Sequence, residues 1–249
     1  MSVAEVFSTH SHIYATAENE RFYTRIAAAL AEKVSSRLAP GKILEVGAGT
    51  GAATIILKRY FPKAEILATD PSREMLAHNR QKGLEGVRHA CLRAEDASRL
   101  DEKYDLIFGN ICYHWFKPGT ARELSRLLTP AGVLAFSTPT SGQEKGDGNL
   151  IMFRICRELG VKGRHGRHLS SLSRLRKEFA HLKNVATETI TLRETYPPAF
   201  HGTLMRARGS WTFIFGTEAG NAENLWRKYT TGRALTTLYW HITLVVAGL

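Results

Sequence analysis

The residues best suited to chemistry lie in a glycine-rich turn. Gly-Ala-Gly-Thr-Gly at positions 47–51 follows the apolar run 43–46 and precedes the apolar segment 52–57. This order is typical of a strand, a turn and a helix that open a βαβ unit. Alternate glycines let the backbone turn tightly and let a ligand approach it closely. The turn alone is compatible with a dinucleotide and with S-adenosylmethionine.

Four polar side chains fall where predicted strands end, namely Glu45, Asp70, Asp96 and Asn110. Ligands of open parallel sheets bind beyond this edge. Asp70, roughly twenty residues after the turn, is suited to accept hydrogen bonds from ribose hydroxyls. An aspartate before Pro71 also suits a helix N-cap, and that alternative stays open.

Glu45 helps to choose between the cofactors. A pyrophosphate binds to backbone N–H groups and positive potential, which a carboxylate beside the turn opposes. A ligand with an ammonium and a sulfonium is favoured instead. Asp96 could accept a hydrogen bond from the adenine amino group, and the backbone N–H of Ala97 could donate to a ring nitrogen. Together these groups favour S-adenosylmethionine over NAD.

The elements that position these groups alternate along the chain. Residues 1–17 read as irregular, and a helix is expected from about 18 to 37. Alternation of strands and helices predicts an open parallel sheet with helices on both faces. The strands are expected at 43–46, 65–69, 87–92, 104–108 and 133–138.

The character of the chain changes after Pro139, where a loop leads into a segment rich in Arg, Lys and His. Two further strands are expected there, at 185–192 and 238–246. Helices are expected near 150–159, 171–181, 199–208 and 221–229.

Composition sets the outer limits. The chain has 249 residues, of which 43% are hydrophobic, which is enough for one sizeable core. A net charge of +11 suits an acidic partner, or serves solubility alone. Three widely spaced cysteines suggest neither a disulfide framework nor a zinc site. We find no signal peptide, and the apolar stretch 242–249 is too short to span a bilayer, so we expect a cytoplasmic protein without a membrane partner.

Several segments resemble a known family. The stretches 45–51, 70–76 and 104–110 resemble the class I S-adenosylmethionine-dependent methyltransferases. Within that class, further segments resemble the malonyl-acyl-carrier-protein O-methyltransferases of biotin synthesis. These are 7–14, with Phe7 and Tyr14, then 110–116, 134–138 and 238–241. The resemblance covers nearly the whole chain and is weak over 140–235.

The resemblance implies an α/β, Rossmann-like fold with a seven-stranded, mostly parallel sheet and a helical cap. As one methyltransferase domain, the chain would divide into four segments: an N-terminal cap segment and helix (1–40), a cofactor-binding core (41–139), a basic substrate cap with strand six (140–235) and a last strand (236–249).

The resemblance also implies the cofactor S-adenosyl-L-methionine, the product S-adenosyl-L-homocysteine and no metal. The glycine turn and Glu45 would line the methionine side, Asp70 the ribose, and the backbone of Asn110 the ammonium. Tyr14 would close over the reacting centre. The cofactor residues expected on this basis are Tyr14, Glu45, Gly47, Ala48, Gly49, Gly51, Asp70, Pro71, Met75, Asp96, Ala97, Asn110 and Trp115.

The acceptor implied by the resemblance is the carboxylate of a malonyl group on an acidic acyl carrier protein. A carboxylate is ionised at pH 7 and needs no general base, so the enzyme would contribute orientation and removal of water. His114 is the nearest candidate base and is a candidate catalytic residue with Tyr14. Tyr113, Arg206 and Arg208 are candidate acceptor contacts. The basic residues that could steer an acidic carrier are Arg154, Arg157, Lys162, Arg164, Arg167, Arg174 and Arg176.

Three alternatives remain. A methyltransferase of a small free acid, such as trans-aconitate, would share the core. A basic methyltransferase could act on RNA, but the stretch Asn-Ile-Cys-Tyr at 110–113 lacks the two prolines typical of enzymes that methylate base amines, which argues against a nucleic-acid partner. A protein that binds the cofactor without catalysis could keep the same fold.

Overall fold

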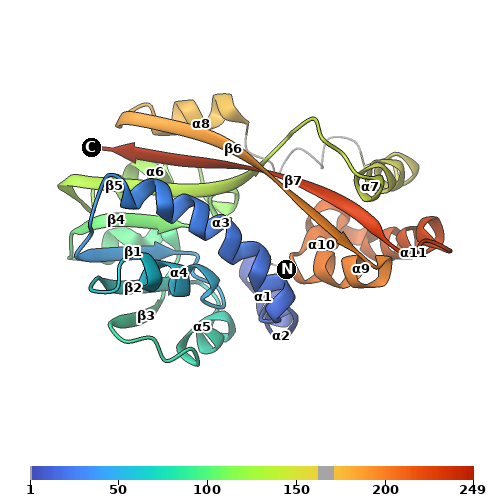
Figure 1. The fold of residues 1–249 in the computed structure, drawn as a ribbon, viewed down its shortest axis with the longest axis horizontal. Helices are drawn as coiled ribbons and strands as arrows, with labels where there is room; N and C mark the ends of the chain where they lie inside the picture. The colour runs from blue at the N-terminus through green and yellow to red at the C-terminus, as the bar shows by residue number, and fades with distance from the viewer. Residues whose placement is uncertain (1, 162–170) are drawn as a thin grey trace.

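One twisted sheet organises the molecule. The computed structural model describes residues 2–161 and 171–249, and in them the strands form a seven-stranded sheet in the order β3-β2-β1-β4-β5-β7-β6 (Figure 1). β1 to β5 are parallel, and β7 is antiparallel to β5 and β6. The expected α/β fold is confirmed. The strands are β1 (Lys42–Val46), β2 (Glu65–Asp70), β3 (Val87–Cys91), β4 (Tyr104–Gly109), β5 (Leu128–Thr140), β6 (Lys183–Tyr196) and β7 (Thr236–Gly248).

Helices cover both faces of the sheet. Successive strand residues point to opposite faces, so Ile43 packs in one core cluster with α3 and α4, while Leu44 packs in a second with α6 and α8. The helices are α1 (Val3–Thr9), α2 (Ser11–Tyr14), α3 (Ala17–Ser35), α4 (Ala52–Tyr60), α5 (Arg73–Arg80), α6 (Thr120–Ser125), α7 (Asp147–Glu158), α8 (Leu172–Phe179), α9 (Pro198–Ala207), α10 (Ser210–Phe215) and α11 (Ala219–Thr230), with short 3₁₀ turns η1 (Ala94–Arg99), η2 (Tyr113–Trp115) and η3 (Gly216–Glu218).

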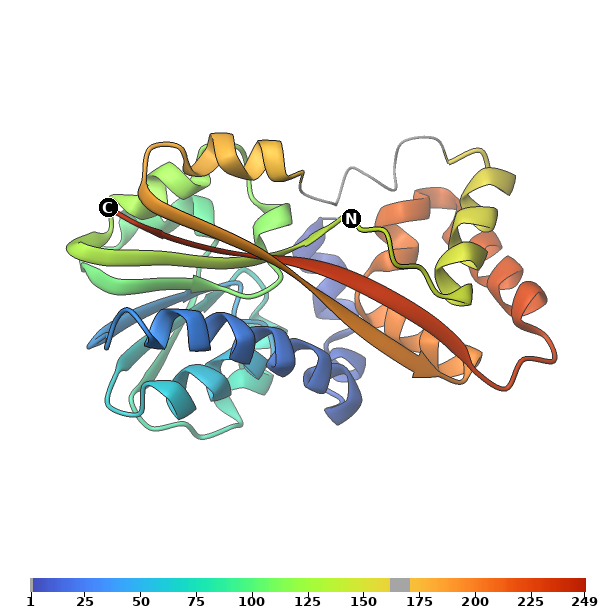
Figure 2. The ribbon, with the colours of Figure 1, turned by 45° about the horizontal axis from the view of Figure 1, so that its top comes forward.

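Beyond the sheet, β6 and β7 continue as a two-stranded ribbon. Pairing of β5 with β7 ends at Thr140 and His241, whereas β6 and β7 stay paired as far as Tyr196 and Thr236. Such a ribbon is marginally stable by itself. It is covered by α7, α9, α10 and α11, which enclose a third apolar cluster that includes Trp211. Figures 1 and 2 show the ribbon leaving the sheet to reach these helices. We call the outer ribbon and these four helices the cap.

The N-terminal segment lies where the sheet and the cap meet (Figure 1). The Ser8 hydroxyl of α1 makes 2.8 Å hydrogen bonds with Ser72 and with Glu74 of α5, and α2 packs against α9. The segment therefore joins the two parts of the molecule. In the described part of the chain, none of the helices is both long and apolar enough to cross a membrane.

The expectation of an irregular segment at 1–17 is wrong, because α1 and α2 occupy most of it. These helices are short, and within them only Val6 and Ser11 are buried. The sequence therefore shows no apolar residues recurring at helical spacing. A local signal did exist, since Ser2 and Glu5 form a reciprocal capping box.

The short helix α10 was also not expected. Its sequence, Ser-Trp-Thr-Phe-Ile-Phe, has no polar face. It begins after Gly209, whose φ of +71° allows the sharp change of direction from α9.

Candidate active site

The glycine turn lies between β1 and α4, against the loop that follows β4. Gly47 has a φ of +67°, a conformation that other residues rarely adopt. A Cβ atom there would lie 2.6 Å from the Cβ of Cys112. The turn and the loop after β4 can therefore approach each other only because position 47 has no side chain.

Asp70, the last residue of β2, ties this turn to the neighbouring strand. Its carboxylate accepts hydrogen bonds from the backbone N–H groups of Gly49 at 3.0 Å and Ser72 at 2.8 Å. Burial raises the pKa of Asp70 to about 6, although both N–H donors act in the opposite direction. The hydroxyl of Ser72, not the carboxylate of Asp70, caps α5. The cap role considered for Asp70 is therefore filled by its neighbour.

Glu45 lies beneath the turn and is almost fully buried. One carboxylate oxygen accepts a 2.7 Å hydrogen bond from the Thr54 hydroxyl, and the other, Oε1, has no partner in the described residues. Burial raises the pKa of Glu45 to about 8, and the nearby Asp70 adds to this effect. A cationic group brought near the turn would lower that pKa and stabilise the ionised form.

A cavity of about 100 Å³ opens beside these groups. We call it the strand-edge cavity. It lies at the carboxyl ends of β1, β2 and β4, where open α/β sheets bind ligands. Expected cofactor residues in its wall are Tyr14, Gly47, Gly49, Asp70, Pro71, Met75, Asn110 and Trp115.

The other expected cofactor residues lie outside that wall. Ala48 and Gly51 form the far part of the turn, and Glu45 lies below it. Asp96 and Ala97 belong to η1. The Asp96 carboxylate lies 3.6 Å from Arg99 in an ion pair.

The side-chain amide of Asn110 holds the loop after β4 in place. It donates to the backbone carbonyl of Tyr23 at 3.0 Å and accepts from the Ser137 hydroxyl at 2.8 Å. The next residue, Ile111, has a φ of +52°, which is strained for a β-branched side chain. The Ser137 hydroxyl stabilises this conformation by accepting from the Ile111 N–H at 2.8 Å. Sequence reasoning missed the role of Ile111, because no residue type signals it.

The residues of the strand-edge cavity fit S-adenosylmethionine. Asp70 has acceptor capacity for ribose hydroxyls beyond its two backbone partners. The orphaned Glu45 oxygen gives the buried region below the turn a need for a donor or a positive charge. The faces of Tyr14 and Trp115 are suited to a sulfonium cation. The described residues contain no group of three or more His, Cys, Asp or Glu side chains that could hold a metal.

A second cavity, of about 130 Å³, adjoins the first toward the cap. We call it the central cavity. The two share Phe7, Tyr14, Ile111 and Trp115. The ring centroid of Phe7 lies 5.8 Å from that of Tyr14 and 5.9 Å from those of Trp115 and Phe213. Aromatic rings from α1, α2, η2 and α10 thus surround the passage between the cavities.

Arg208 places a positive charge in the wall of the central cavity. Its two terminal nitrogens donate to the Glu194 carboxylate at 2.7 and 3.0 Å, and its Nε donates to the Asn19 amide oxygen at 2.9 Å. The guanidinium also lies 4.1 Å from the centre of the Phe22 ring. These bonds use three of the five N–H donors that a guanidinium carries, so two stay available for a ligand. No sequence signal linked Arg208 with Glu194 or Asn19.

Tyr14 lies between the two cavities, and its ring stacks on Tyr23 at a centroid distance of 4.9 Å. Burial, followed by the neighbouring Tyr23, raises the pKa of the Tyr14 phenol well above its ordinary value. Tyr14 therefore stays protonated at neutral pH and can donate a hydrogen bond, but it cannot serve as a base there.

The other residues expected at the acceptor site lie in different parts of the structure. His114 lines the central cavity, with its ring 4.4 Å from that of Trp115. Tyr113 is buried among Phe116, Phe136 and Phe179 in the second core cluster, and it lines neither the strand-edge cavity nor the central cavity.

Arg206 also lies away from the cavities. Its guanidinium pairs with Glu223 of α11 near the surface. Of the two arginines expected to contact the acceptor, Arg208 lines the central cavity, and Arg206 lines neither it nor the strand-edge cavity.

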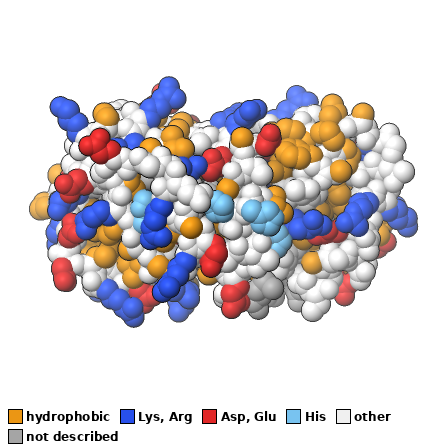
Figure 3. All heavy atoms as spheres, turned by 90° about the horizontal axis from the view of Figure 1, so that it is seen from below, with side chains coloured by type: hydrophobic (Ala, Val, Ile, Leu, Met, Phe, Trp, Pro, Cys, Tyr) orange, Lys and Arg blue, Asp and Glu red, His pale blue; other side chains and the backbone are white. Residues whose placement is uncertain are grey.

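The basic residues do not form one patch on the face shown in Figure 3, where Lys and Arg side chains are scattered among Asp and Glu. Arg154 lies flat on Tyr229, 3.8 Å from the ring centre. Lys162, Arg164 and Arg167 lie outside the described residues.

Comparisons with known proteins define the class. The sequence model of the family described as "Methyltransferase domain" matches residues 44–134. The YcgJ protein of Bacillus subtilis has the same fold, with a TM-score of 0.60 and 17% identity over 89% of this chain and 97% of that one. The plantazolicin methyltransferase BpumL, solved with S-adenosylhomocysteine, gives a TM-score of 0.50 at 12% identity over 98% and 95% of the two chains. Residues 44–134 thus match a methyltransferase domain, and the chain has the fold of class I S-adenosylmethionine-dependent methyltransferases.

Relatives found by sequence similarity include methyltransferases with a named acceptor. The malonyl-[acyl-carrier protein] O-methyltransferase of Acetivibrio thermocellus is 42% identical over 99 residues. The matched stretch covers 39% of this chain and 35% of that relative. The likeness thus spans about a third of the relative's length, and it bears on the acceptor only as a proposal.

Proposed function

We propose that this methyltransferase esterifies the free carboxylate of a malonyl group carried as a thioester by an acidic acyl carrier protein, as in the synthesis of a biotin precursor. The observation that carries the proposal is the single, already paired cation of an apolar central cavity. Among the described residues that line this cavity, Arg208 is the only Lys or Arg. The similarity to malonyl-carrier-protein methyltransferases supports the same acceptor.

Charge distinguishes a malonyl thioester from a free acid. The thioester has one carboxylate, whereas free malonate has two and aconitate three. Burying a charge without a partner is strongly unfavourable. Arg208 is already partly neutralised by Glu194, so the central cavity suits a single carboxylate whose remaining structure is neutral. This argument favours the carrier-bound acceptor over the small free acids.

The bound cofactor would supply an electrophilic methyl group on a positively charged sulfur. An acceptor carboxylate oxygen would form the new bond to the methyl carbon as the carbon–sulfur bond breaks, and the electron pair of the broken bond would stay on sulfur. The negative and the positive charge would both be neutralised, so the residues of the site would have no proton to transfer. The absence of proton transfer agrees with a site in which the pKa of Tyr14 is too high for a base.

In this mechanism the protein orients the reactants and excludes water. Arg208 would hold the carboxylate through its two remaining N–H groups. Glu194 would reduce the positive charge on Arg208, so that the carboxylate is oriented without losing its nucleophilicity. Phe7 and Trp115 would keep water from the reacting oxygen. Orientation of this kind contributes up to about 7–11 kcal/mol in favourable cases.

On the cofactor side, we assign the ribose to Asp70, the methionine portion to the glycine turn and the adenine to Asp96 and Ala97. Hydrogen bonds from Gly49 and Ser72 hold the carboxylate of Asp70 in the strand-edge cavity. The adenine assignment has the least structural support, because Asp96 and Ala97 do not line that cavity.

The test is a methylation assay that measures S-adenosylhomocysteine formation with four acceptors: malonyl-carrier protein, malonyl-CoA, free malonate and trans-aconitate. We expect turnover with the two thioesters and little with the free acids. Equal rates on the free acids would remove the carrier from the proposal. No turnover on any acceptor, with S-adenosylhomocysteine still bound in calorimetry, would indicate a different acceptor or a protein that only binds the cofactor.

A further inference from the structure

A third cavity, which we call the outer cavity, continues from the central one through the cap. It has a volume of about 440 Å³, within the range of pockets that hold drug-sized ligands. It shares Pro139, Ser210, Ile214 and Trp240 with the central cavity. The three cavities therefore form a series from the edge of the sheet to the surface of the cap. A small acid bound at Arg208 would leave this outer space unused.

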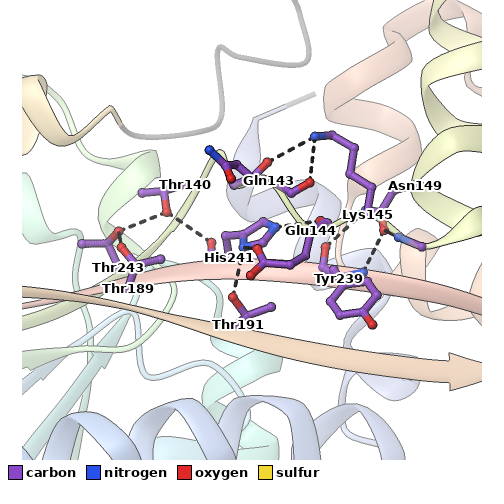
Figure 4. A network of polar contacts seen from close by, with 12 residues as sticks. Thr140, Gln143, Glu144, Lys145, Asn149, Thr189, Thr191, Tyr239, His241 and Thr243 are labelled. Atoms are coloured by element: carbon purple, nitrogen blue, oxygen red, sulfur yellow. Dashed lines mark hydrogen bonds and ion pairs between the residues drawn. The ribbon is translucent and has the colours of Figure 1, made fainter.

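The wall formed by the loop after β5 is held in a defined position (Figure 4). The ring of His241, on β7, contacts the backbone carbonyl of Glu144 through Nε2 at 2.9 Å. The amide oxygen of Asn149 accepts from the backbone N–H groups of Gly146 at 2.9 Å and Tyr239 at 2.8 Å. These contacts fasten the loop to β7 and define this wall of the outer cavity.

The chemistry of the outer cavity suits a long, mostly neutral chain. Its apolar walls come from α7, α9, α10 and β7, and include Met152, Met205, Ile214 and Leu238. Methionine side chains adapt to flexible ligands. The exposed Lys145 is the only Lys or Arg among the described lining residues. Figure 4 shows it on the same loop as Glu144.

Lys145 has a defined place at the outer opening. Its ammonium donates to the backbone carbonyls of Gly142 and Gln143, both at 3.3 Å, and lies 5.7 Å from the centre of the Phe153 ring. Glu144 does not neutralise it directly, because its carboxylate faces His241 at 3.5 Å. Among the described residues, this one exposed cation in the wall of an apolar cavity fits a ligand with one anionic group at its outer end.

We propose that the outer cavity holds the phosphopantetheine arm of the acceptor, with the phosphate at Lys145 and the thioester end at Trp240. This assignment rests on the proposed function, and it adds a binding site to it. The malonyl carboxylate then reaches Arg208 in the central cavity, and the carrier protein itself stays outside, beside α7. The arm consists of apolar and amide segments that end in a phosphate, which suits a cavity with apolar lining, a shared wall with the central cavity at Trp240 and an exposed cation at Lys145.

The first test compares malonyl thioesters of increasing arm length: malonyl-N-acetylcysteamine, malonyl-pantetheine and malonyl-phosphopantetheine. KM should fall with each added segment. Lys145→Glu should raise KM for the phosphate-bearing acceptor by about tenfold, as expected for the loss of a hydrogen bond to a charged group, and should leave KM for malonyl-N-acetylcysteamine unchanged. Lys63→Glu, an equal charge change at an exposed residue of the core, is the control and should change neither.

The second test narrows the junction between the cavities. Ser210, at the start of α10, lines both of them, and Ser210→Trp should raise KM for malonyl-pantetheine at least tenfold. Its affinity for S-adenosylhomocysteine should stay unchanged, which also shows that the variant is folded. Ser173→Trp, at an exposed position of α8, is the matched control.

The outcomes separate the two proposals. If no malonyl thioester is methylated, the proposed function is wrong, and this assignment falls with it. If all thioesters are methylated with the same KM, and Lys145→Glu and Ser210→Trp have no effect, the proposed function stands and the outer cavity does not bind the arm.

Discussion

The core and the cap form the walls of their cavities in different ways. In the core, many of the lining groups are backbone turns and strand-end side chains, such as the glycine turn and Asp70, and their positions follow from the order of the strands. In the cap, the corresponding groups are side chains from elements far apart in sequence. Arg208 of the central cavity, for example, depends on Glu194 and Asn19.

The core and the cap also differ in their sequence similarity to known proteins. The methyltransferase family match, residues 44–134, lies within the core. The cap follows it and is supported by a ribbon that extends past the sheet. The family model thus matches the core by sequence and does not extend into the cap, as expected of a protein class in which the donor is constant and the acceptor varies. Changes in the cap should therefore alter acceptor turnover and leave cofactor affinity intact, and changes in the core should do the reverse.

The largest effect should come from Arg208→Met, which tests the cap side of this contrast. Removing one member of a buried ion pair leaves the other charge, Glu194, without compensation. We expect a loss of about 3–5 kcal/mol in the free energy of unfolding. Turnover of a malonyl thioester should fall by about 100-fold or more, because two charge-assisted hydrogen bonds are lost. Urea denaturation and the methylation assay measure the two effects.

The double variant Arg208→Met, Glu194→Gln separates folding from function. With the uncompensated carboxylate removed, we expect most of the stability to return, while turnover stays low. Calorimetry should give wild-type affinity for S-adenosylhomocysteine. Recovery of turnover in the double variant would exclude Arg208 as a contact of the acceptor carboxylate.

The next largest effect should come from Gly47→Ala, which tests the core side. The new Cβ would overlap the Cβ of Cys112 in a backbone conformation that alanine disfavours. Strain and overpacking together should cost about 2–4 kcal/mol. The strand-edge cavity would be distorted, so affinity for S-adenosylhomocysteine should fall with stability.

Gly83→Ala is a matched control for this variant. Gly83 has a similar φ of +61°, but a Cβ there would meet nothing within 4 Å. The change should therefore cost only about 1 kcal/mol of backbone strain and should not affect cofactor affinity. If the two variants bind S-adenosylhomocysteine equally well, the close approach of the turn to Cys112 does not matter for binding.

The difference between the core and the cap also explains which features could be predicted from the sequence. Strands β1 to β4 were expected to within one residue of their observed ends, because turn residues bound each of these short segments. The strand expected at 133–138 is longer, since β5 begins five residues earlier, at Leu128. The glycine turn and Asp70 could be assigned to one edge, since parallel strands bring their carboxyl ends together whatever the rest of the chain does. Topology alone thus indicated the strand-end part of the strand-edge cavity, while its N-terminal wall, with Phe7 and Tyr14, comes from helices that were not expected.

The central and outer cavities could not be predicted in this way. The late strands were expected at 185–192 and 238–246, but they extend to Tyr196 and begin at Thr236. Those extra residues form the ribbon that carries the cap helices. The position of each cap side chain depends on that length and on packing between α7, α9, α10 and α11. Both Arg206 and Arg208 were expected to contact the acceptor. Only the structure shows that Arg208 lines the central cavity while Arg206 pairs with Glu223.

The smallest effect should be a pH dependence that belongs to the core alone. The pKa of Asp70 is raised to about 6 by burial, and its ionised form is the better acceptor for ribose hydroxyls. As pH falls from 7 to 5, Asp70 gains a proton, and affinity for S-adenosylhomocysteine should weaken by about tenfold, since about one molecule in ten stays ionised at the lower pH. Asp70→Asn should bind more weakly at pH 7 and lose the dependence in this range. Arg208→Met with Glu194→Gln should retain it, because the change lies in the cap. A dependence that persists in Asp70→Asn would assign the titration to another group, for which Glu45 below the turn is the first candidate, whereas unchanged affinity of Asp70→Asn at pH 7 would remove the ribose contact from Asp70.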